Sequence, residues 1–384
     1  MRAAVSAMFL MNGFVVGSWA PLVPELAQQH GLSESALGLL ILTLGLGSIL
    51  IMPVSGALIA RIGALPVLRV TCILCSLALL PVALAPGVPV LVGVLFVFGG
   101  IIGSMDIAMN ANAVVVEKRL RKAIMSSCHG FWSLGGLIGA AAGGVLIDRF
   151  GSGMQVALVS AIALVIALSF VTRLAPDLPL AADAKPRFRL TLAPMPYVVG
   201  LVALFSMVPE GAILDWGALY LRQDLGADVT YSGLAFGAVA ATMAVMRFAG
   251  DAVRRKFGAV TTMRYSAIVA AVGLLLAATA SGPTMAIAGF ALSGIGIANL
   301  VPVALSAAGN LPGLQPGVGI SIATSMGYSG ILMAPALIGF IAEYQSFSVA
   351  FMGLAALFIV VLGLSPVARH ADLNEAAETP FAGG

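Results

Sequence analysis

Long apolar runs make up most of the chain, and Gly, Pro and charged residues interrupt them at intervals. A run of about 20 apolar residues is long enough to cross a hydrocarbon core of ~30 Å as a helix. The runs and their interruptions predict twelve membrane-spanning helices. These helices begin near residues 3, 35, 66, 89, 123, 153, 195, 229, 262, 284, 316 and 346. We therefore expect an all-α integral membrane protein.

The composition leads to the same class of protein. Hydrophobic residues account for 60% of the sequence, charged residues for 9%, and the mean hydropathy is +1.07. Soluble domains average roughly 45–50% apolar and ~25% charged residues. Most of the outward surface should therefore face lipid. The net charge of +3 is confined to a few loops, which argues against nucleic-acid binding.

No motif for enzymatic chemistry stands out. The sequence lacks both a G-x-x-x-x-G-K-[ST] phosphate-binding loop and an HExxH pair, so neither an enzyme nor an ATP-driven pump is predicted. Cys72, Cys75 and Cys128 lie in apolar stretches and are interpreted as packing residues. Cys72 and Cys75 have the C-x-x-C spacing of a redox or metal pair, but no His or second pair stands nearby. We expect no metal and no cofactor.

Basic residues indicate the orientation. With a cytoplasmic N-terminus, only Arg149 and Arg222 fall outside, Arg247 lies within the eighth span, and the other Lys and Arg residues are cytoplasmic. Cytoplasmic loops carry an excess of Lys and Arg, so both termini are predicted to be cytoplasmic. The longest polar connection, from about Arg173 to Pro194, divides the chain near its middle. We predict one six-helix bundle over 1–174, a cytoplasmic linker over 175–193, a second bundle over 194–367 and a cytoplasmic tail over 368–384.

The two halves resemble each other at a nearly fixed offset. Gly56 precedes Gly250 by 194 residues, and Phe96 precedes Phe290 by the same number. The GVLID run at 144–148 matches GFIAE at 339–343, and two tryptophans match at a similar offset. Several matches in the same order indicate duplication of a six-helix unit.

Two such halves, a basic central loop, and glycine-rich basic loops between spans two and three and between spans eight and nine resemble the major facilitator superfamily. The residues that match the loop signature of that superfamily are Gly56, Arg61, Gly63 and Arg69 in the first half and Gly250, Lys256, Gly258 and Arg264 in the second. Ala60 and Arg255 stand where the signature has Asp. This departure predicts a weakened charge lock at the inner gate, with the fold unchanged.

Three segments resemble the bacterial fucose-permease-like branch of this superfamily: MDIAMNANAVVVE at 105–117, HGFWSLGGLIGA at 129–140 and PEGAILDWGALYL at 209–221. The resemblance implies two pseudo-symmetric six-helix bundles and a proton-linked transporter of a small polar, often sugar-like, solute. It also implies a multi-pass protein of the bacterial inner membrane, and we expect a monomer. The predicted partners are the solute, protons and membrane lipid.

Two acids within predicted spans are candidates for proton coupling. Asp106 lies eleven residues before Glu117, or about 16 Å along a helix, which places it near the centre of the hydrocarbon core. An ionisable residue at that depth normally faces a cavity and has a function there. Glu210 stands between Pro209 and Gly211, where an interrupted helix can line a central site. The alternatives are a buried Asp106 bonded to Asn110 for packing, and a Glu210 that caps a structural kink.

Polar uncharged residues of the spans are candidates for substrate binding. An indole can pack against a sugar ring and its N–H can donate a hydrogen bond, which makes Trp132 one candidate. The others are Asn12, Asn110, Asn299, Tyr328 and Ser329. Such residues also hold helices together, typically for ~0.6 kcal/mol each in membranes, so a packing role stays open for every one of them.

Four residues are assigned to gating. His129 lies in the first turns of the fifth span, where it could relay protons or bond the preceding loop. Asp215 is expected to form a hydrogen bond at the outer gate. Arg247 is expected to pair with Asp251, one turn further on, and to lock the inner end of the eighth span.

These observations predict a proton-coupled secondary active transporter that works by alternating access. The alternative is a proton-coupled exporter of amphipathic or toxic compounds. A cavity lined by methionines with few hydrogen-bonding groups would favour the exporter, whereas Asn, Trp and carboxylates would favour sugar-like cargo. A receptor that keeps the fold without transporting is a third class, which an additional soluble domain would indicate.

Overall fold

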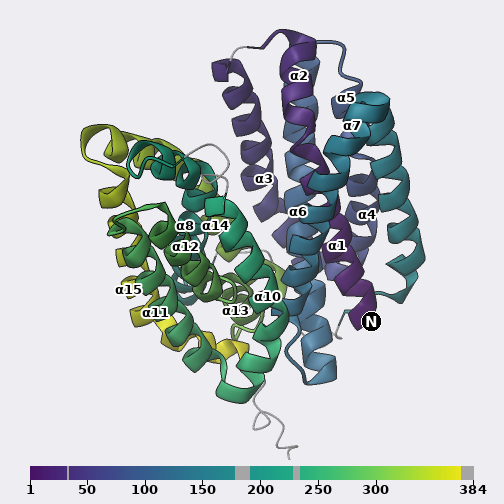
Figure 1. Ribbon diagram of the computed structural model, residues 1–384. Coiled ribbons are helices and arrows are strands. Elements are labelled where there is room, and N and C mark those ends of the chain that lie inside the picture. The colour runs from purple at the N-terminus through teal and green to yellow at the C-terminus, as the bar shows by residue number, and fades with distance from the viewer. Residues whose placement is uncertain (33, 178–190, 228–233, 373–384) are drawn as a thin grey trace, which may run out of the picture.

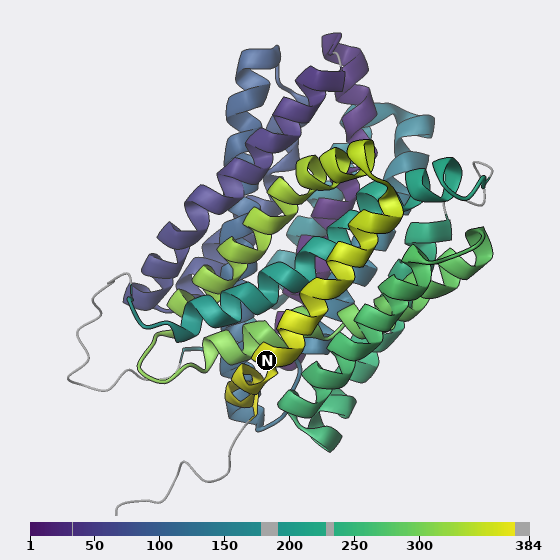
Figure 2. The ribbon, with the colours of Figure 1, turned by 90° about the vertical axis from the view of Figure 1, so that its left-hand side faces the viewer.

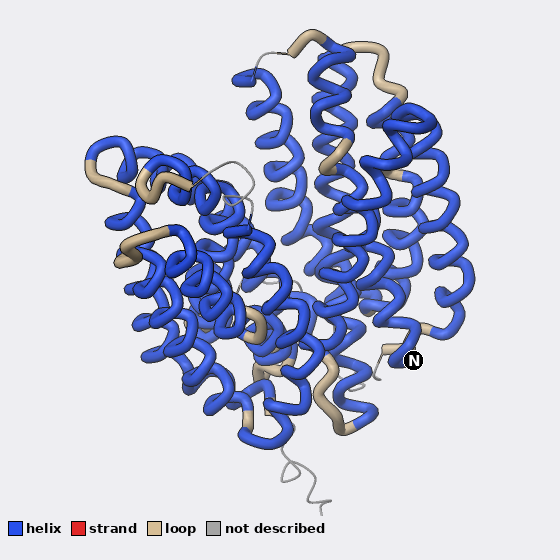
Figure 3. The backbone as a smooth tube through the Cα atoms, in the orientation of Figure 1, coloured by secondary structure: helices blue, strands red, loops and turns tan. Residues whose placement is uncertain are grey.

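The computed structural model describes residues 1–32, 34–177, 191–227 and 234–372. All regular structure in these residues is helical (Figure 3). The first half contains α1 (Arg2–Trp19), α2 (Leu22–His30), α3 (Glu34–Ile62), α4 (Ala64–Leu77), α5 (Leu79–Ala83), α6 (Val88–Leu120), α7 (Met125–Phe170) and η1 (Val171–Arg173). The second half contains α8 (Met195–Gln223), α10 (Leu234–Phe257), α11 (Ala259–Ala278), α12 (Pro283–Ile297), α13 (Leu300–Gly309), α14 (Pro316–Tyr344), α15 (Phe347–Leu364) and η2 (Ser365–Ala371).

These helices provide the twelve predicted spans. Among the described residues, nine helical stretches are long and apolar enough to cross a membrane. One of them, Met125–Arg173, contains two helices that meet at Gly151, where the backbone leaves the helical conformation. The helices α1 and α10 complete the set, and each buries a polar side chain, Asn12 and Arg247 respectively. The all-α membrane architecture expected from the sequence is therefore confirmed.

The two halves lie side by side and diverge toward one end (Figure 1). Turned by 90°, the second half lies in front of the first (Figure 2). The N-terminus lies at the opposite end, where the halves meet. Arg2 contacts Ser127 there, and Arg254 contacts the carbonyl of Ala371 near the last described residue. We call this the terminal end of the molecule. The predicted linker and tail limits are not tested, because residues 178–190 and 373–384 lie outside the described part of the chain.

Glycines allow helices within the first half to pack backbone against backbone. A Cβ atom on Gly13 or Gly17 of α1 would overlap the backbone of α7 at Trp132 and Gly136. A Cβ atom on Gly135 of α7 would likewise overlap the carbonyl of Leu10. Small residues at helix contacts permit this close approach in membranes. At these glycines the backbones of α1 and α7 therefore meet with no side chain between them.

The duplication seen in the sequence recurs in the structure. Gly63 and Gly258 precede α4 and α11, and both have a positive φ, of 88° and 78°, that side-chain-bearing residues rarely adopt. The carboxylate of Asp177 accepts hydrogen bonds from the first backbone N–H groups of α4, at 2.7 and 3.0 Å. Asp372 caps the start of α11 similarly, with both carboxylate oxygens accepting from the single N–H of Ala259, at 2.8 and 3.1 Å. In each half, an acid from the C-terminal segment of that half thus caps the N-terminus of the third span.

Candidate functional site

A cavity of about 280 Å³ lies between the two halves. Helices α1, α3, α6 and α7 of the first half and α8, α10, α13 and α14 of the second line it. The side chains that line it are Val16, Trp19, Leu44, Ser48, Phe98, Ile102, Asp106, His129, Trp132, Ala203, Met207, Glu210, Arg247, Val301, Leu305, Thr324, Tyr328 and Ile331. Its walls are largely apolar, and its polar groups can therefore act in a region of low dielectric constant.

Asp106 lines this cavity from α6 and is only 8% exposed. Asn110, one turn further along α6, donates a hydrogen bond from Nδ2 to Asp106 Oδ1 at 3.3 Å and to the carbonyl of Asp106 at 2.8 Å. The other end of the Asn110 amide, Oδ1, lies 3.1 Å from Nε2 of His129 on α7. Asp106, Asn110 and His129 therefore form a connected chain of polar groups along one wall. Such a chain fixes the orientation of the Asp106 carboxyl group and of the His129 ring.

The opposite wall carries an ion pair. Arg247 of α10 donates from Nη2 to Oε1 of Glu210 on α8 at 3.2 Å. Its other terminal nitrogen, Nη1, donates to the hydroxyl of Ser133 on α7, which belongs to the other half. The Glu210 side chain is 32% exposed and that of Arg247 only 9%. A buried guanidinium thus reaches from the second half to the first across the cavity.

Aromatic residues complete the site. Trp132 lines the cavity from α7, and its indole N–H donates to Asn12 Oδ1 at 2.9 Å. Asn12 itself is buried between helices, so it orients the indole and does not line the cavity. Tyr328 lines the cavity from α14. Among the described residues, therefore, a flat indole face and a phenol are presented to whatever enters.

Like Asn12, the fully buried Asn110 does not line the cavity, and three further predicted site residues lie away from it. Asn299 precedes α13 and lies against Gly250 and Ser126, and both polar atoms of its amide are buried without a hydrogen-bond partner. Ser329 donates to the carbonyl of Met326 in its own helix. Asp215 is exposed on α8 and does not line the cavity. In this conformation none of the three can contact a solute in the cavity.

Two expectations about the gate residues require correction. The ion pair expected between Arg247 and Asp251 is not formed, because Arg247 turns into the cavity toward Glu210, while the Asp251 carboxylate accepts from two backbone N–H groups of α7. His129 bonds Asn110 of α6 and not the preceding loop. It lines the cavity and packs edge-on against Phe9, with ring centroids 5.2 Å apart.

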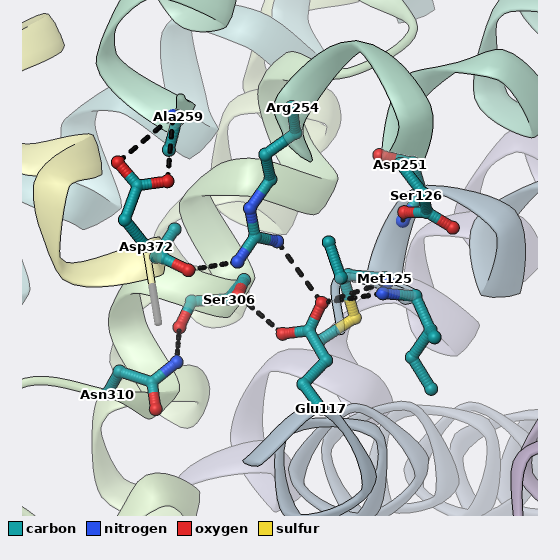
Figure 4. Close-up of polar contacts among 12 residues, drawn as sticks. Glu117, Met125, Ser126, Asp251, Arg254, Ala259, Ser306, Asn310 and Asp372 are labelled. Carbon is teal, nitrogen blue, oxygen red and sulfur yellow. Dashed lines mark hydrogen bonds and ion pairs between the residues drawn. The ribbon is translucent and has the colours of Figure 1, made fainter. Parts of the chain in front are cut away.

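The terminal end of the cavity is closed by charged groups that join the two halves (Figure 4). Glu117 at the end of α6 pairs with Arg254 of α10 at 3.1 Å, and its other oxygen accepts from Ser306 of α13 at 2.6 Å. Both side chains of the pair are buried, at 0% and 3% exposure. Glu117 also accepts from the backbone N–H groups of Ile124 and Met125, at 2.9 and 3.1 Å.

Asp251 adds a second link at the same place. Its two carboxylate oxygens accept from the N–H groups of Ser126 and Ser127, at 2.9 and 3.0 Å. The N-terminus of a helix carries partial positive charge and unpaired N–H groups, which favour a carboxylate. We call the contacts of Glu117, Asp251, Arg254 and Ser306 the ionic seam.

The α3–α14 contact closes the same end without charge. A Cβ atom on Gly56 of α3 would lie 2.5 Å from Cβ of Ser321 on α14 and 2.9 Å from the carbonyl of Gly317. Ser321 donates from its hydroxyl to the carbonyl of Met52 at 3.0 Å. We call this contact, defined by Met52, Gly56, Gly317 and Ser321, the packed seam.

Sequence reasoning did not identify Glu117, Arg254 and Ser306 as gate residues. Glu117 stands at the junction of an apolar run and a basic loop, where an exposed acid is the ordinary interpretation. Its partner Ser306 is 189 residues away. One signal was available in the repeat, because Asp251 and Arg254 fall in the second copy of the loop that begins at Gly56. Among the described residues, no three His, Cys, Asp or Glu side chains gather as a metal site would require.

Comparison with known proteins agrees with the helical membrane fold described above. The family model described as Major Facilitator Superfamily matches residues 5–216 and 199–382. An uncharacterised MFS-type transporter of Yersinia pestis is 34% identical over 92% of both chains. An uncharacterised transporter of Sinorhizobium fredii, y4wD, is 33% identical over 95% of this chain and 97% of its own. Membrane protein MosC of Rhizobium meliloti is 29% identical over 94% and 87% of the two chains.

Solved structures share the fold at low identity. The Escherichia coli fucose:proton symporter FucP superposes with a TM-score of 0.80 at 17% identity, over 96% of this chain and 98% of its own. The human organic anion transporter MFSD10 gives a TM-score of 0.76 at 16% identity, over 95% and 98% of the two chains. At such identities the likeness concerns the arrangement of helices and does not extend to the cargo.

Proposed function

The chain belongs to the major facilitator superfamily, and from that premise we propose that it is a proton-coupled secondary active transporter. Its solute is small, polar and sugar-like, and it crosses the inner membrane by alternating access between the two halves. The observation that carries the proposal is the buried Asp106 at the wall of a cavity to which both halves contribute. One structural neighbour with this fold is described as a fucose:proton symporter.

In this mechanism Asp106 exchanges the proton. Apolar walls favour the neutral, protonated form of a carboxyl group. A nearby positive charge or the entry of solvent favours the ionised form, so the group can release its proton. Asn110 orients the Asp106 carboxyl group and links it to His129, and Trp132 and Tyr328 hold the solute. Glu210 couples the second half to the same event, since it is partly exposed and already paired with Arg247.

The orientation follows from the charges at the terminal end. Basic residues such as Lys118, Arg119 and Arg255 lie near the ionic seam, and cytoplasmic loops carry the excess of positive charge. The terminal end, with the N-terminus and the last described residues before 373, is therefore assigned to the cytoplasm. The structure then corresponds to a state whose cytoplasmic gate is closed and whose halves diverge toward the outside.

A second candidate function is proton-coupled export of amphipathic compounds. The apolar walls formed by residues such as Ile102, Val301 and Leu305 favour it. Against it, Met207 is the one methionine among the described residues that line the cavity, and two carboxylates, an arginine, a histidine and an indole N–H face the same space or border it. The polar set favours the first function.

The substitution Asp106→Asn tests the proton step. It keeps the size of the side chain and removes the exchangeable proton, so proton-driven accumulation should fall to background while counterflow of solute continues. The measurement is uptake into proteoliposomes with and without an imposed pH gradient. Asp148→Asn, which removes an exposed acid outside the cavity, is the matched control and should accumulate solute normally. Unchanged gradient-driven uptake in Asp106→Asn would refute the proposal.

A further inference from the structure

Arg247 is the one Lys or Arg among the described residues that line the cavity, and its guanidinium is incompletely paired. Nη1 donates to Ser133 and Nη2 makes a single hydrogen bond, of 3.2 Å, to Glu210. Nε is buried and has no hydrogen-bond partner. A guanidinium offers five N–H donors in a fixed fork and cannot lose its charge inside a protein. The site therefore holds a permanent cation with donors to spare.

The geometry of this arginine suits a carboxylate better than a hydroxyl group. Carboxylates bind guanidinium through two parallel hydrogen bonds, most often to two nitrogens on one edge of the fork. Of the two nitrogens on the edge formed by Nε and Nη2, only Nη2 has a hydrogen-bond acceptor, the Glu210 carboxylate. Glu210 is the more exposed partner and can withdraw toward solvent. A second carboxylate can then occupy the whole edge.

Replacement of Glu210 by another carboxylate at Arg247 must also keep the charges of the site in balance. Two carboxylates beside one guanidinium in a cavity with apolar walls repel each other, so one of them must be neutral. If Glu210 takes a proton as the new carboxylate binds, the charge around Arg247 stays the same. The ion pair between Arg247 and Glu210 is broken, one pair to the incoming anion is formed, and the proton from solvent is carried on Glu210.

We propose that the transported solute carries a carboxylate group, which binds Arg247 in place of Glu210 while Glu210 becomes protonated. This inference rests on the proposed function and assigns its substrate to the class of small organic acids, with a ring or hydroxyls that pack against Trp132 and Tyr328. The link from Arg247 to Ser133 crosses between the halves, so the anion is bound where the two halves meet.

Other titratable groups face the same space and must be considered. They are Asp106 of α6, His129 of α7 and Tyr328 of α14, and Tyr328 is close enough to both Asp106 and Glu210 to interact with them electrostatically. None of them makes a hydrogen bond to Arg247 that would replace Glu210 among the described contacts. The proposed exchange takes up a proton, so the solute carboxylate should bind more tightly at lower pH.

The test is a thermal unfolding assay of the purified full chain in detergent, with matched pairs of neutral and acidic probes. D-galactose is paired with D-galacturonate and benzyl alcohol with benzoate, at constant ionic strength, at pH 5.5 and pH 8. A ligand that binds the folded form raises the unfolding temperature. We expect at least one acid to stabilise the wild type, more at pH 5.5 than at pH 8, and to do so more than its neutral partner.

Variants separate the inference from a nonspecific effect. Glu210→Gln should bind the same acid at both pH values, because the competing charge has been removed. Arg247→Gln should weaken acid binding by roughly 10- to 100-fold, the loss expected for a charge-assisted hydrogen-bonded pair, and Arg247→Lys should recover part of it. Arg264→Gln removes an arginine outside the cavity, where Arg264 bonds Ser365, and should behave as the wild type.

Two results would overturn the inference. One is stabilisation by the neutral probes with no dependence on Arg247, and the other is the absence of acid-specific stabilisation in both the wild type and Glu210→Gln. Either result leaves the proposed function standing if Asp106→Asn still loses gradient-driven accumulation. If Asp106→Asn instead transports as Asp148→Asn does, the proposed proton mechanism fails while acid binding at Arg247 can still be observed.

Discussion

The ionic seam and the packed seam close the same end of the molecule by different physical means. At the ionic seam, the buried pair of Glu117 and Arg254 and the carboxylate of Asp251 join the halves. At the packed seam, which is its counterpart in the duplicated architecture, Gly56 lies against Ser321 with no charge involved. Ala60 stands in the first copy where the family signature has Asp. Arg255 stands at the same place in the second copy, so the charges of the ionic seam come from other residues, Asp251 and Arg254. One copy of the loop thus closes through charges and the other through close contact.

This difference indicates what each seam requires in order to open. Opening the ionic seam exposes buried charges to water, which hydrates them well, so separation is compensated by solvation. Opening the packed seam removes small-residue contacts that are individually weak and depend on shape. The ionic seam should therefore be sensitive to the loss of one partner, and the packed seam to added volume.

The largest effect is expected from Glu117→Gln, which leaves Arg254 buried without its counter-charge. Removing one member of a buried pair typically destabilises by about 3–5 kcal/mol. Because the pair exists only when the gate is closed, the conformational equilibrium should shift toward the opposite opening. The readout is alkylation of a cysteine introduced at Val16 in the cavity, by an impermeant reagent applied from outside, in a background without Cys72, Cys75 and Cys128.

External labelling of that cysteine should slow in Glu117→Gln. The double variant Glu117→Gln with Arg254→Gln should recover much of the loss, since no uncompensated charge remains. If the single and double variants label at the same rate as the wild type, the pair does not hold the gate closed.

A smaller effect is expected from Gly56→Ala at the packed seam. The added Cβ would lie 2.5 Å from Cβ of Ser321, and overpacking of this kind costs about 1–3 kcal/mol. The same labelling assay and the unfolding temperature provide the measurement. Gly144→Ala is the matched control, because no atom lies within 4 Å of the new Cβ there. Ser321→Gly in the Gly56→Ala background should restore part of the wild-type rate, because the contact with the carbonyl of Gly317 remains. Equal behaviour of Gly56→Ala and Gly144→Ala would contradict close packing at this seam.

The smallest effect is expected from removal of single helix caps, and it sharpens the comparison between halves. Asp251→Ala and Asp177→Ala each remove a carboxylate from a helix N-terminus, a loss of about 0.5–2 kcal/mol. Asp251 caps a helix of the other half, whereas Asp177 caps a helix of its own. Both variants should unfold at lower temperature, but only Asp251→Ala should change labelling at position 16. A change in labelling with Asp177→Ala would show that the two caps are not distinct.

The span pattern and the repeat could be predicted from the sequence because both follow from local composition. Apolar length determines a membrane helix, and duplication leaves its mark at a fixed offset. Asp106 and Asn110 could be placed together for the same reason, since a separation of four residues puts two side chains on one face of a helix. Helix geometry alone was enough to predict that Asp106 and Asn110 lie together.

Contacts between helices far apart in the sequence could not be predicted in this way. The spacing of Arg247 and Asp251 favoured a pair within α10, but Glu210 of α8 offers Arg247 a carboxylate, and α7 of the other half offers Asp251 two free N–H groups. The position of His129 near a helix start favours a bond to the preceding loop, because the sequence does not show how far the cavity extends. The span of Asn299 predicts a place in the cavity, but Asn299 lies at the break between α12 and α13, against Gly250.

The α1–α7 seam has a mechanical consequence. Sliding or tilting of one helix past the other is hindered where their backbones touch, because no flexible side chain lies between them at those glycines to absorb the movement. The contacts of Gly273 with Ser293 and of Gly289 with Ala277 give α11 and α12 the same stiffness in the second half. Each half therefore moves as a rigid body. A covalent cross-link inside one half should leave transport turnover intact, whereas a cross-link between the halves should stop it.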